Sequence, residues 1–385
     1  MLKFLTAGES HGRCLIGILD GIPSGLTLFE NDINIELGRR QKGFGRGVRM
    51  EIEKDRVEIL SGVRWGKTLG SPIALLIQNR DWANWEKAMS TNPEDSGSTP
   101  PVTRPRPGHA DLAGAIKYRH RDIRDVLERS SARETAMRVA LGAITKALLK
   151  EFGMKVISHV TEIGGIRAEK KGMTIRDIEE KADESDVRCP DQSASKKMID
   201  KIKEASVKGD SLGGIFEIIV TGSPAGLGSY VQWDKRINSR LSKALMSIPA
   251  IKGVESGLGF RIAEMYGSEV HDEIYYESSR FYRKTNNAGG IEGGITNGED
   301  ILLRAVMKPI PTLRKPLKSV DIITKEPFDA TYERSDICAV PSASVVGEAM
   351  VALELADAMI EKFGGDSIVE MKRNYEGYIE YVKSL

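Results

Sequence analysis

The stretch VRMEIEKDRVEILSG, residues 48–62, distinguishes between two broad classes of mixed α and β fold. Apolar and polar residues alternate in both of its halves, on either side of Lys54 and Asp55. This alternation around a polar turn predicts a β-hairpin, in which two antiparallel strands follow each other without a helix between them. Because neighbouring strands of a doubly wound parallel sheet need a helical crossover, the hairpin favours an α+β fold.

Apolar runs on both sides of this hairpin predict further strands. CLIGILDGIPSG (14–25) begins with such a run and ends in a Gly/Pro turn. The other runs are PIALLIQN (72–79), MKVISHVTEI (154–163), GIFEIIVTG (214–222), ILLRAVM (301–307) and VDIIT (320–324). The proline-rich residues 90–107 predict a long surface loop.

Helices are expected between and after these strands. The longest covers 132–152 and begins at a capping box, SARE (131–134). The others are expected over 31–41, 174–208 (two helices), 234–247, 343–363 and 366–382. Asn31 or Asp32 is the expected cap of the first of these, and Asp234 is the expected cap of the helix that follows it.

The composition fits a soluble globular protein, since 40% of the 385 residues are hydrophobic and 29% are charged. The net charge is only +1, whereas proteins that bind nucleic acid usually carry a basic excess. The three cysteines are far apart and form no CxxC pair, which argues against a disulfide framework or a zinc site. Because no apolar segment is long enough for a signal peptide or a membrane span, we expect a cytoplasmic protein without membrane or nucleic-acid partners.

A glycine-rich loop, RRQKGFGRGVRM (39–50), concentrates positive charge. Arg40, Arg46 and Arg49 stand near glycines that let the backbone approach a ligand closely. Arg side chains grip phosphate and carboxylate oxygens through two N–H groups at once. The residues alone leave two interpretations open, an anion-binding site and a solvated charged loop.

In the segment RPRPGHADLAG (104–114), a histidine follows a stretch of restricted backbone. Two X-Pro pairs restrict the chain before Gly108, which frees the backbone beside His109. A histidine on so rigid a backbone is a candidate for proton transfer, and a structural role is the alternative. Arg106 stands three residues away as a further contact for an anion.

A second histidine lies in TAGESHGRCLIG (6–17), where Glu9, Ser10 and His11 stand between two glycines. A polar cluster just before an apolar strand is costly to bury and unnecessary for a plain turn. The cluster is therefore a candidate functional site.

The motif ERSSARET (128–135) adds hydroxyl groups and further arginines. Its capping box places Ser130 and Ser131 at a helix N-terminus, which attracts anions. Arg129 and Arg133 flank these serines, so the motif is either an anion site or an ordinary cap with two surface arginines.

The motif ERSDICAVPSASVVGEAM (333–350) adds a carboxylate. Asp336 is either an ion-pair partner of Arg334 or Arg40, or a proton acceptor at the edge of a ligand. Together the motifs describe a pocket for a small polyanion with groups for proton transfer and without a metal site. The sequence has no glycine fingerprint for a dinucleotide after a strand and no P-loop.

Taken in order, GESHG, RRQKGFGRGVRM, RPGHAD, ERSSARET and ERSD followed by GEA resemble the chorismate synthase family. The likeness runs from residue 3 to about residue 360 and includes NNAGGIEGGITNG (286–298) and KPIPT (308–312). It implies one domain over 1–385, a β-α-β sandwich with helices between antiparallel sheets. It also implies a homotetramer that converts 5-enolpyruvylshikimate 3-phosphate into chorismate and phosphate by an anti-1,4-elimination.

The resemblance implies reduced FMN as the cofactor, although the reaction has no net redox change. Because no reductase module is recognisable in the sequence, we expect an external flavin reductant. The cofactor-binding residues that it implies are Arg129, Ser130, Ser131, Ala250, Gly293, Lys308, Thr312 and Arg334.

The resemblance also assigns roles to the polar motifs. The residues implied for substrate binding are Ser10, Arg40, Arg46, Arg49, Arg106, Ser131, Arg133 and Arg334. His11 is expected to protonate the leaving phosphate, and His109 to face the flavin and favour its reduced, anionic form. Asp336 is expected to work near the flavin N5 atom in removing the ring proton. The other histidines match no motif and are expected to be structural or surface residues.

Two other function classes remain open at this point. A nucleic-acid-binding module would use Arg39–Arg49 as a basic arm, but the near-neutral charge and the 6% aromatic content count against it. A flavin oxidoreductase is the weaker alternative, because the sequence has no nicotinamide-binding fingerprint.

Overall fold

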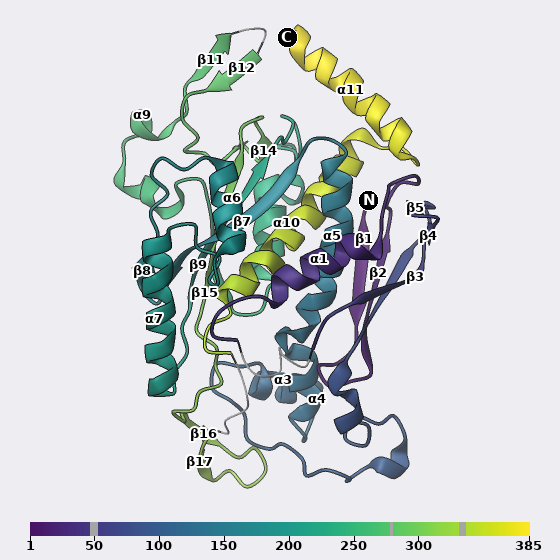
Figure 1. The fold of residues 1–385 in the computed structure, drawn as a ribbon, viewed down its shortest axis with the longest axis vertical. Coiled ribbons are helices and arrows are strands. Elements are labelled where there is room, and N and C mark those ends of the chain that lie inside the picture. The colour runs from purple at the N-terminus through teal and green to yellow at the C-terminus, as the bar shows by residue number, and fades with distance from the viewer. Residues whose placement is uncertain (47–52, 278–279, 331–335) are drawn as a thin grey trace.

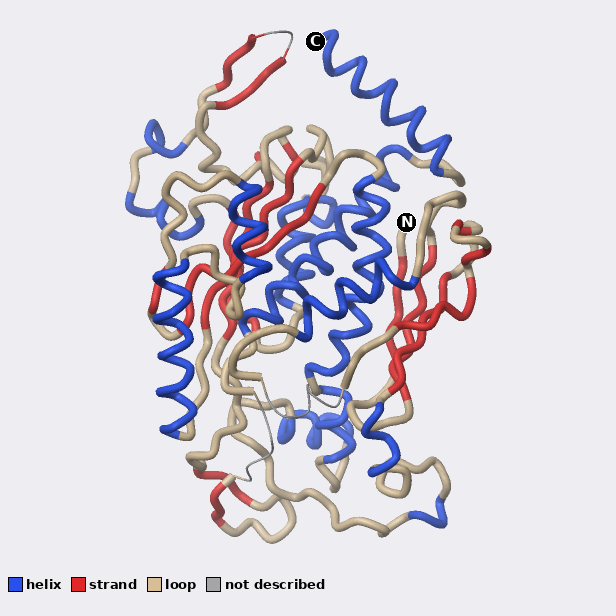
Figure 2. Tube along the Cα trace, in the orientation of Figure 1, coloured by secondary structure: helices blue, strands red, loops and turns tan. Residues whose placement is uncertain are grey.

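In the computed structural model, two antiparallel sheets enclose a layer of helices (Figure 1). The structure describes residues 1–46, 53–277, 280–330 and 336–385. Figure 2 shows the same layers as red strands on either side of blue helices. The arrangement confirms the expected α+β fold with helices sandwiched between antiparallel sheets.

The first sheet has the strand order β1-β2-β6-β3, and every neighbouring pair is antiparallel. Its strands are β1 (Lys3–Ala7), β2 (Cys14–Asp20), β3 (Val57–Ser61) and β6 (Ile73–Gln78). Every second residue of β2 and β6 is buried, as expected for strands that pack one face on helices. A β-carbon at Gly17 would lie 2.5 Å from Sδ of Met137, so this glycine lets β2 approach helix α5 (Thr135–Lys150) closely.

The second sheet has the order β10-β15-β9-β7-β8 and is also antiparallel throughout. Its strands are β7 (Lys155–Ile163), β8 (Ile166–Arg167), β9 (Gly214–Thr221), β10 (Ile251–Ser256) and β15 (Ile301–Met307). The centres of β7 and β9 are buried at consecutive positions, because both faces of the sheet are covered.

The helical layer is built around α5 and α10 (Val340–Phe363), with α1 (Glu30–Gln41) and α8 (Ile237–Met246) beside them. Helix α10 is buried along almost its whole length, since it packs on α5 and also on β7 and β9. Gly142 of α5 makes this approach possible, because a β-carbon there would lie 2.3 Å from Cβ of Ala349.

The remaining elements surround the sandwich. Helix α6 (Ile175–Glu184) packs on β7, α7 (Gln192–Lys208) packs on β8, and α11 (Ile368–Ser384) follows α10. The short helices are α3 (Asp111–Tyr118), α4 (Arg124–Ser130) and α9 (Gly267–Val270). The short strand pairs are β4–β5 (Val63–Arg64, Lys67–Thr68), β11–β12 (Ile274–Glu277, Arg280–Arg283), β13–β14 (Ile291–Glu292, Ile295–Thr296) and β16–β17 (Lys318–Val320, Pro327–Asp329). Single 3-10 turns lie at Arg80–Asn84, Pro93–Asp95, Ala132–Glu134, Trp233–Lys235 and Gly259–Glu264.

The hairpin expected over 48–62 is described only in its second half. Residues 47–52 lie outside the described residues, and β3 accounts for the apolar alternation that follows. Strand β3 pairs antiparallel with β6. The antiparallel arrangement is therefore confirmed, whereas the hairpin itself stays a prediction.

Two of the expected helix caps are wrong. Helix α1 begins at Glu30, so Asn31 and Asp32 lie inside its first turn, where Oδ2 of Asp32 accepts the N–H of Phe29 at 3.3 Å. Acidic residues are favourable both as caps and in the first turn, which makes the exact start hard to predict. Asp234 lies in a separate 3-10 turn ahead of α8.

The strand expected at VDIIT is also wrong, because only Val320 belongs to β16. Oδ1 of Asp321 accepts the N–H groups of Ile323 at 2.8 Å and Thr324 at 3.1 Å, and these bonds bend the chain into a turn.

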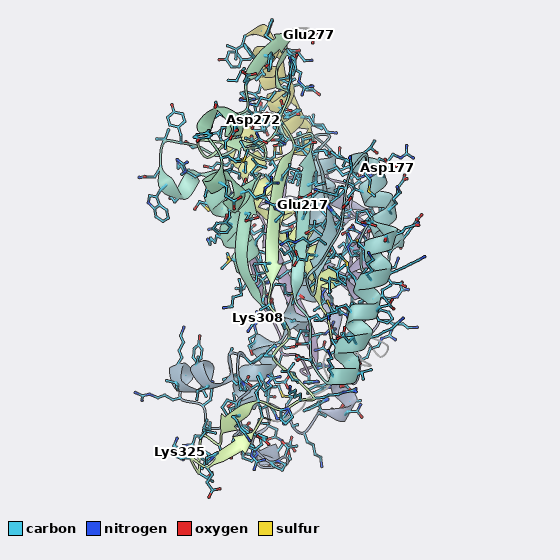
Figure 3. The ribbon with its side chains drawn as sticks, turned by 90° about the vertical axis from the view of Figure 1, so that its left-hand side faces the viewer. Asp177, Glu217, Asp272, Glu277, Lys308 and Lys325 are labelled. Carbon is cyan, nitrogen blue, oxygen red and sulfur yellow. The ribbon has the colours of Figure 1, made fainter. Side chains whose placement is uncertain are left out.

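The segments with the predicted site residues gather at one end of the sandwich. This is the lower end in Figure 1, where α3, α4 and β16–β17 lie. Lys308, directly after β15, marks the same end of the second sheet in the side view of Figure 3, far from Asp272 and Glu277.

Candidate active site

His11 lies in the loop between β1 and β2, where α4 holds it in place. Its Nδ1 lies 2.8 Å from Oε1 of Glu128, and its backbone N–H donates to Oε2 of the same carboxylate at 2.7 Å. The imidazole stacks on Trp85 with 4.1 Å between ring centroids. The hydroxyl of Ser10 donates to Oγ of Ser131 at 3.1 Å. The structure therefore brings Ser10, His11 and Ser131 together, as expected.

Arg40 and Arg133 belong to a buried network around Asp55, here called the Asp55 cluster. Arg133 donates from Nε to Asn79 at 2.9 Å, and its Nη1 lies 2.5 Å from Oδ1 of Asp55. Arg40 donates to Oγ1 of Thr135 at 3.0 and 3.1 Å, and its Nη1 lies 3.5 Å from Oδ2 of Asp55. Burial lowers the pKa of Arg40 to about 10, so it is still cationic at neutral pH. The cluster holds two guanidinium groups in fixed positions.

Arg46 and Asp336 form an ion pair beside this cluster. Nε of Arg46 lies 3.3 Å from Oδ2 of Asp336, and the N–H of Ile337 joins the two segments by donating to the carbonyl of Gly45 at 2.8 Å. Both charges of the pair act on the pKa of Arg40, which places them near the Asp55 cluster. Arg49 and Arg334 lie outside the described residues, so their places in the site stay predictions.

A second buried carboxylate holds His109. Oδ1 of Asp111 lies 2.5 Å from Nδ1 of His109, and the Asp111 side chain is 1% exposed. Arg106 donates from Nε to Oδ2 of Asp111 at 2.8 Å and from Nη1 to Thr312 at 3.3 Å. Burial by itself would raise the pKa of Asp111, but the hydrogen bonds from His109 and Arg106 outweigh it and hold the pKa well below its usual range.

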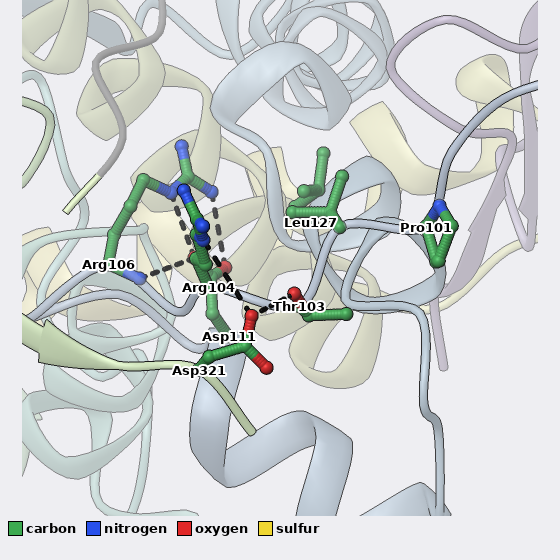
Figure 4. A pocket seen from close by; sticks show the side chains of 8 residues that line it. Pro101, Thr103, Arg104, Arg106, Asp111, Leu127 and Asp321 are labelled. Atoms are coloured by element: carbon green, nitrogen blue, oxygen red, sulfur yellow. Dashed lines mark hydrogen bonds and ion pairs between the residues drawn. The ribbon is translucent and has the colours of Figure 1, made fainter. Parts of the chain in front are cut away.

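A cavity of about 380 Å³ lies beside the Arg106 and Asp111 side chains that hold His109 (Figure 4). Arg106 and Asp111 line it from one side and Leu127 of α4 from another, and Thr103 and Asp321 complete it near β16. The cavity shows that the α3 and α4 segments share one polar pocket at this end of the sandwich.

Lys308 contacts Gly108, the residue before His109. Its ammonium donates to the carbonyl of Gly108, and its backbone N–H donates to the carbonyl of Ala250 at 3.0 Å. Burial, and the nearby positive charge of Lys252, lower the pKa of Lys308. The structure thus brings Ala250 and Lys308 next to the Arg106 and His109 group, which includes the contact to Thr312.

Comparisons with known proteins agree with this arrangement. The sequence model of the family described as chorismate synthase matches residues 2–360. This chain belongs to the chorismate synthase family. The chorismate synthase of Geobacter metallireducens is 58% identical over 395 residues, which cover 100% of both chains. That of Geobacillus sp. (strain WCH70) is 56% identical over 386 residues, which cover 99% of this chain and 100% of the relative.

A solved structure described as a crystal structure of chorismate synthase has the same fold. It aligns with a TM-score of 0.81 and 46% identity, and the alignment covers 100% of this chain and 99% of that chain. The resemblance drawn from the motifs is thereby confirmed, and the chain is an enzyme of the carbon–oxygen lyase class that acts in aromatic biosynthesis.

One residue expected from the chorismate synthase family lies away from the others. Gly293 stands in the β13–β14 turn, where the carbonyl of Gly294 accepts the N–H of Ile237 at the start of α8 at 2.9 Å. Ala250 follows the far end of that helix, which has 10 residues and is therefore about 15 Å long. The structure does not bring Gly293 to Lys308.

Two other residues implied by the family are engaged in local bonds. Arg129 donates to the carbonyl oxygens of Thr6 and Gly8 at 2.9 Å each, which ties α4 to β1. Ser130 is the last residue of α4, so only Ser131 stands at a helix start.

The expected capping box around Ser131 is half formed. Oγ of Ser131 accepts the N–H of Arg133 at 3.3 Å, as a cap should, and leads through a 3-10 turn into α5. The carboxylate of Glu134 does not close the box, because it pairs with Arg138 at 2.9 Å.

Sequence reasoning missed the carboxylates that hold the two histidines. Glu128 and Asp111 stand inside the motifs ERSSARET and RPGHAD, so the His109-x-Asp111 spacing offered a usable signal. No local pattern marks Asn79 or Trp85, because their contacts join segments that are far apart in the sequence.

The described residues show neither a metal site nor a membrane span. In this part of the chain, no group of three or more His, Cys, Asp and Glu side chains could hold a metal ion. Across the same residues, no helix combines the length and apolar character that crossing a bilayer requires. Cys338 is buried and Cys14 half-buried, and burial raises the pKa of both thiols, which fits their interpretation as small packing residues.

Proposed function

We propose that the protein converts 5-enolpyruvylshikimate 3-phosphate into chorismate and phosphate by an anti-1,4-elimination, with reduced FMN and no net redox change. One observation carries the proposal: His11 and His109, each held by a buried carboxylate, lie at the same end of the sandwich as Arg46, Arg106 and Arg133. Proton-transfer groups beside fixed cations suit the departure of phosphate from a polyanion.

The charge of the site supports this substrate. The substrate carries a phosphate and two carboxylates, about four negative charges at neutral pH. Nε of Arg46 and Nη2 of Arg133 are buried and have no hydrogen-bond partner among the described residues. An oxyanion would satisfy such donors, and each charged hydrogen bond contributes about 1.5–3 kcal/mol. The residues assigned to substrate binding are Ser10, Arg40, Arg46, Arg49, Arg106, Ser131, Arg133 and Arg334.

The residues present also fit an anionic cofactor such as FMN. The described residues offer the Lys308 ammonium a backbone carbonyl but no carboxylate, while Lys252 is near enough to lower its pKa. A bound anion would relieve this repulsion. Reduced FMN, when bound, supplies an electron-rich ring beside the reacting carbon atoms. The residues assigned to hold it are Arg129, Ser130, Ser131, Ala250, Gly293, Lys308, Thr312 and Arg334.

The chain's own groups divide the proton transfers between them. His11 donates a proton to the phosphate as the C–O bond breaks and the bonding electrons stay on the phosphate oxygen. Asp336, which forms an ion pair with Arg46, assists the removal of the proton from the ring carbon. His109, held by Asp111, would favour the reduced, anionic form of the bound flavin.

The assignment of Asp336 is tested by Asp336→Asn, which keeps the shape of the side chain but cannot take up a proton. We expect normal binding of flavin and substrate with turnover reduced by roughly 10²-fold or more. If KM rises instead and kcat stays near wild type, Asp336 is only the ion-pair partner of Arg46.

The reaction itself is tested by incubating the protein with substrate and reduced FMN without oxygen. We expect chorismate and phosphate to form in equal amounts, and to form only when reduced flavin is present. Absence of product, together with a salt-dependent mobility shift of single-stranded RNA, would instead support the nucleic-acid-binding alternative.

A binding titration tests whether cofactor and substrate share one site. Oxidised FMN alone should bind weakly, and substrate should tighten its binding, because both anions complete one set of cations. Equal FMN affinities with and without substrate would contradict the shared pocket.

We further propose a single-domain chain over 1–385 that assembles as a homotetramer, uses an external flavin reductant and works in the cytoplasm. The family assignment supports these features. Light scattering on the purified protein measures the assembly, and a monomer in solution would overturn that part of the proposal.

A further inference from the structure

The carboxylate of Glu128 holds His11 at two points. Oε2 accepts the backbone N–H of His11 at 2.7 Å, and Oε1 lies 2.8 Å from Nδ1. Because an ionised carboxylate only accepts hydrogen bonds, Nδ1 of His11 carries the hydrogen in this pair. The contact leaves Nε2 as the ring atom that exchanges a proton.

The surroundings of Glu128 strengthen this contact. Its side chain is 1% exposed, whereas that of His11 is 18% exposed. Arg124, one turn earlier on α4, lies 3.9 Å from Oε1 of Glu128. Hydrogen bonds to a charged group are stronger in such a desolvated place than in water.

Trp85 holds the face of the same imidazole. The rings of Trp85 and His11 stack at 4.1 Å with 23° between their planes, and the Arg124 guanidinium lies 5.1 Å from the Trp85 ring. Nε1 of Trp85 donates to Oδ2 of Asp81 at 3.1 Å, which fixes the indole in turn. A flip of the His11 ring would break the contact at Nδ1.

We propose that Glu128 is a positioning residue, which keeps the hydrogen of His11 on Nδ1 and makes Nε2 the donor to the leaving phosphate. The inference rests on the proposed function. In this step the C–O bond breaks, its electron pair remains on the phosphate oxygen, and that oxygen takes the proton from Nε2. Glu128 stays ionised throughout and neither gains nor loses a proton.

The test compares Glu128→Gln and Glu128→Asp with a matched control, Glu134→Gln. Glu134 lies six residues along the chain, is 7% exposed and pairs with Arg138, with no contact to His11 among the described residues. kcat and KM are measured across pH with reduced FMN and substrate, and melting curves and substrate binding are recorded for each variant.

We expect Glu128→Gln to lower kcat by roughly 10–100-fold with little change in KM. Glu128→Asp keeps the carboxylate but at a longer distance, so its kcat should stay closer to that of the wild type. Glu134→Gln should leave kcat and the pH profile unchanged.

The proposal is overturned if Glu128→Gln matches Glu134→Gln in kcat and pH profile, or if only KM and the melting temperature change. A readout independent of catalysis is ¹⁵N NMR of histidine-labelled protein, in which a hydrogen on Nε2 alone would also overturn it. An inactive wild type would contradict the proposed function, whereas an active wild type with an insensitive Glu128 contradicts only this inference.

Discussion

Two buried charged clusters in this protein contain the same residue types but differ in whether their hydrogen bonds are complete. In the helical layer, the Glu348 cluster consists of Glu348 of α10, Arg39 of α1, Lys146 of α5, Ser158 of β7 and Arg188. The Glu348 carboxylate is fully buried and lies 2.6 Å from Arg39, 2.7 Å from Lys146 and 2.7 Å from Ser158. Burial would raise the pKa of Glu348, but the charges of Arg39, Lys146 and Arg188 outweigh it and hold the pKa well below normal.

The end of the sandwich that carries the candidate site is organised differently. Among the described residues, every charged group of the Glu348 cluster has hydrogen-bond partners. Nε of Arg46 and Nη2 of Arg133 have ion-pair contacts but no hydrogen bond, at 3.3 Å to Asp336 and 3.6 Å to Glu53, and Nε of Arg124 is a buried donor without a hydrogen bond. The adjacent Arg39 and Arg40 point into the two different clusters. We expect the complete cluster to stabilise the fold, whereas the proposed anion site would use the donors left at the other end.

The largest effect expected from breaking the incomplete cluster is that of His109→Ala. Turnover should fall by about 10²–10⁴-fold, the usual contribution of a positioned proton-transfer group. The melting temperature should change little, because Asp111 keeps its bonds from Arg106 at 2.8 and 3.1 Å. Steady-state kinetics measure the loss, and full recovery in excess reduced FMN would show that His109 only binds cofactor.

The complete cluster should respond in stability instead. Glu348→Ala removes the buried carboxylate that Arg39, Lys146 and Arg188 share, although Glu36 and Asp183 remain as their partners. The free energy of unfolding should therefore fall, by at most about 3–5 kcal/mol. Glu354→Ala on the same helix is the control, because Glu354 is 23% exposed and its pair with Arg240 should contribute less than about 1 kcal/mol. Denaturant unfolding measures both, and similar losses in the two variants would remove the distinction between the clusters.

Arg46 and Arg40 sharpen the comparison inside the site. Arg46→Ala should raise KM, since one lost charged contact costs about 1.5–3 kcal/mol of binding, with little effect on melting. Arg40→Ala should lower the melting temperature as well, because Arg40 is 4% exposed and bonds Thr135 and Asp55. A sharp loss of stability in Arg46→Ala with an unchanged KM would place Arg46 in the structural group.

Acid should weaken the fold gradually below the ordinary pKa of histidine. Burial first, then the charges of Lys170 and Arg188, lower the pKa of His159 to about 3, from an ordinary value near 6.5. Between these values the unfolded chain takes up a proton and the folded chain does not, so the free energy of unfolding falls as pH falls, by at most about 1.4 kcal/mol per pH unit. Denaturant midpoints at several pH values measure the slope, which His159→Gln should flatten.

Below about pH 4.5 the lowered pKa values of Glu348 and Asp111 add to this loss, because their stabilising charge disappears as they are protonated. A midpoint that is constant from pH 7 to 5 in the wild type would contradict the role of His159.

The elements of regular period could be predicted from the sequence. The buried strands β2, β7, β9 and β15 and the long helix α5 follow the expected runs within a few residues, because an apolar period is a local property. The predictions were wrong where the hydrogen bonds of a single polar side chain determine the backbone conformation. Asp321 turns the chain at an expected strand, and Asp32 lies inside a helix that it was expected to cap.

For the site, the motifs predicted which side chains gather but not what holds them. His11, Ser131, Arg106 and His109 lie at one end of the sandwich, as the motifs indicated. The partner of His11 comes from a residue 117 positions away, and such pairing depends on packing that no local window contains. The contact of Arg39 with Glu348, 309 positions away, likewise depends on packing that the loop pattern does not contain.

The burial of α10 at the centre of the sandwich has a consequence for synthesis on the ribosome. Helix α5 and strands β7 and β9, which pack on α10, are synthesised before it. Early segments also bond to this late part of the chain. The N–H of Leu2 bonds to Asp357 at 2.5 Å, the Ser342 hydroxyl to the carbonyl of Arg40 at 2.8 Å, and the N–H of Ser24 to the carbonyl of Asp366 at 2.9 Å. At about 5–20 residues per second, the stretch from the end of β9 at Thr221 to the end of α10 at Phe363 takes on the order of 7–28 s to emerge. Throughout that interval the faces of α5, β7 and β9 that pack on α10 stay uncovered in the nascent chain, so the time at which a chaperone is needed is set by the late position of α10 in the sequence.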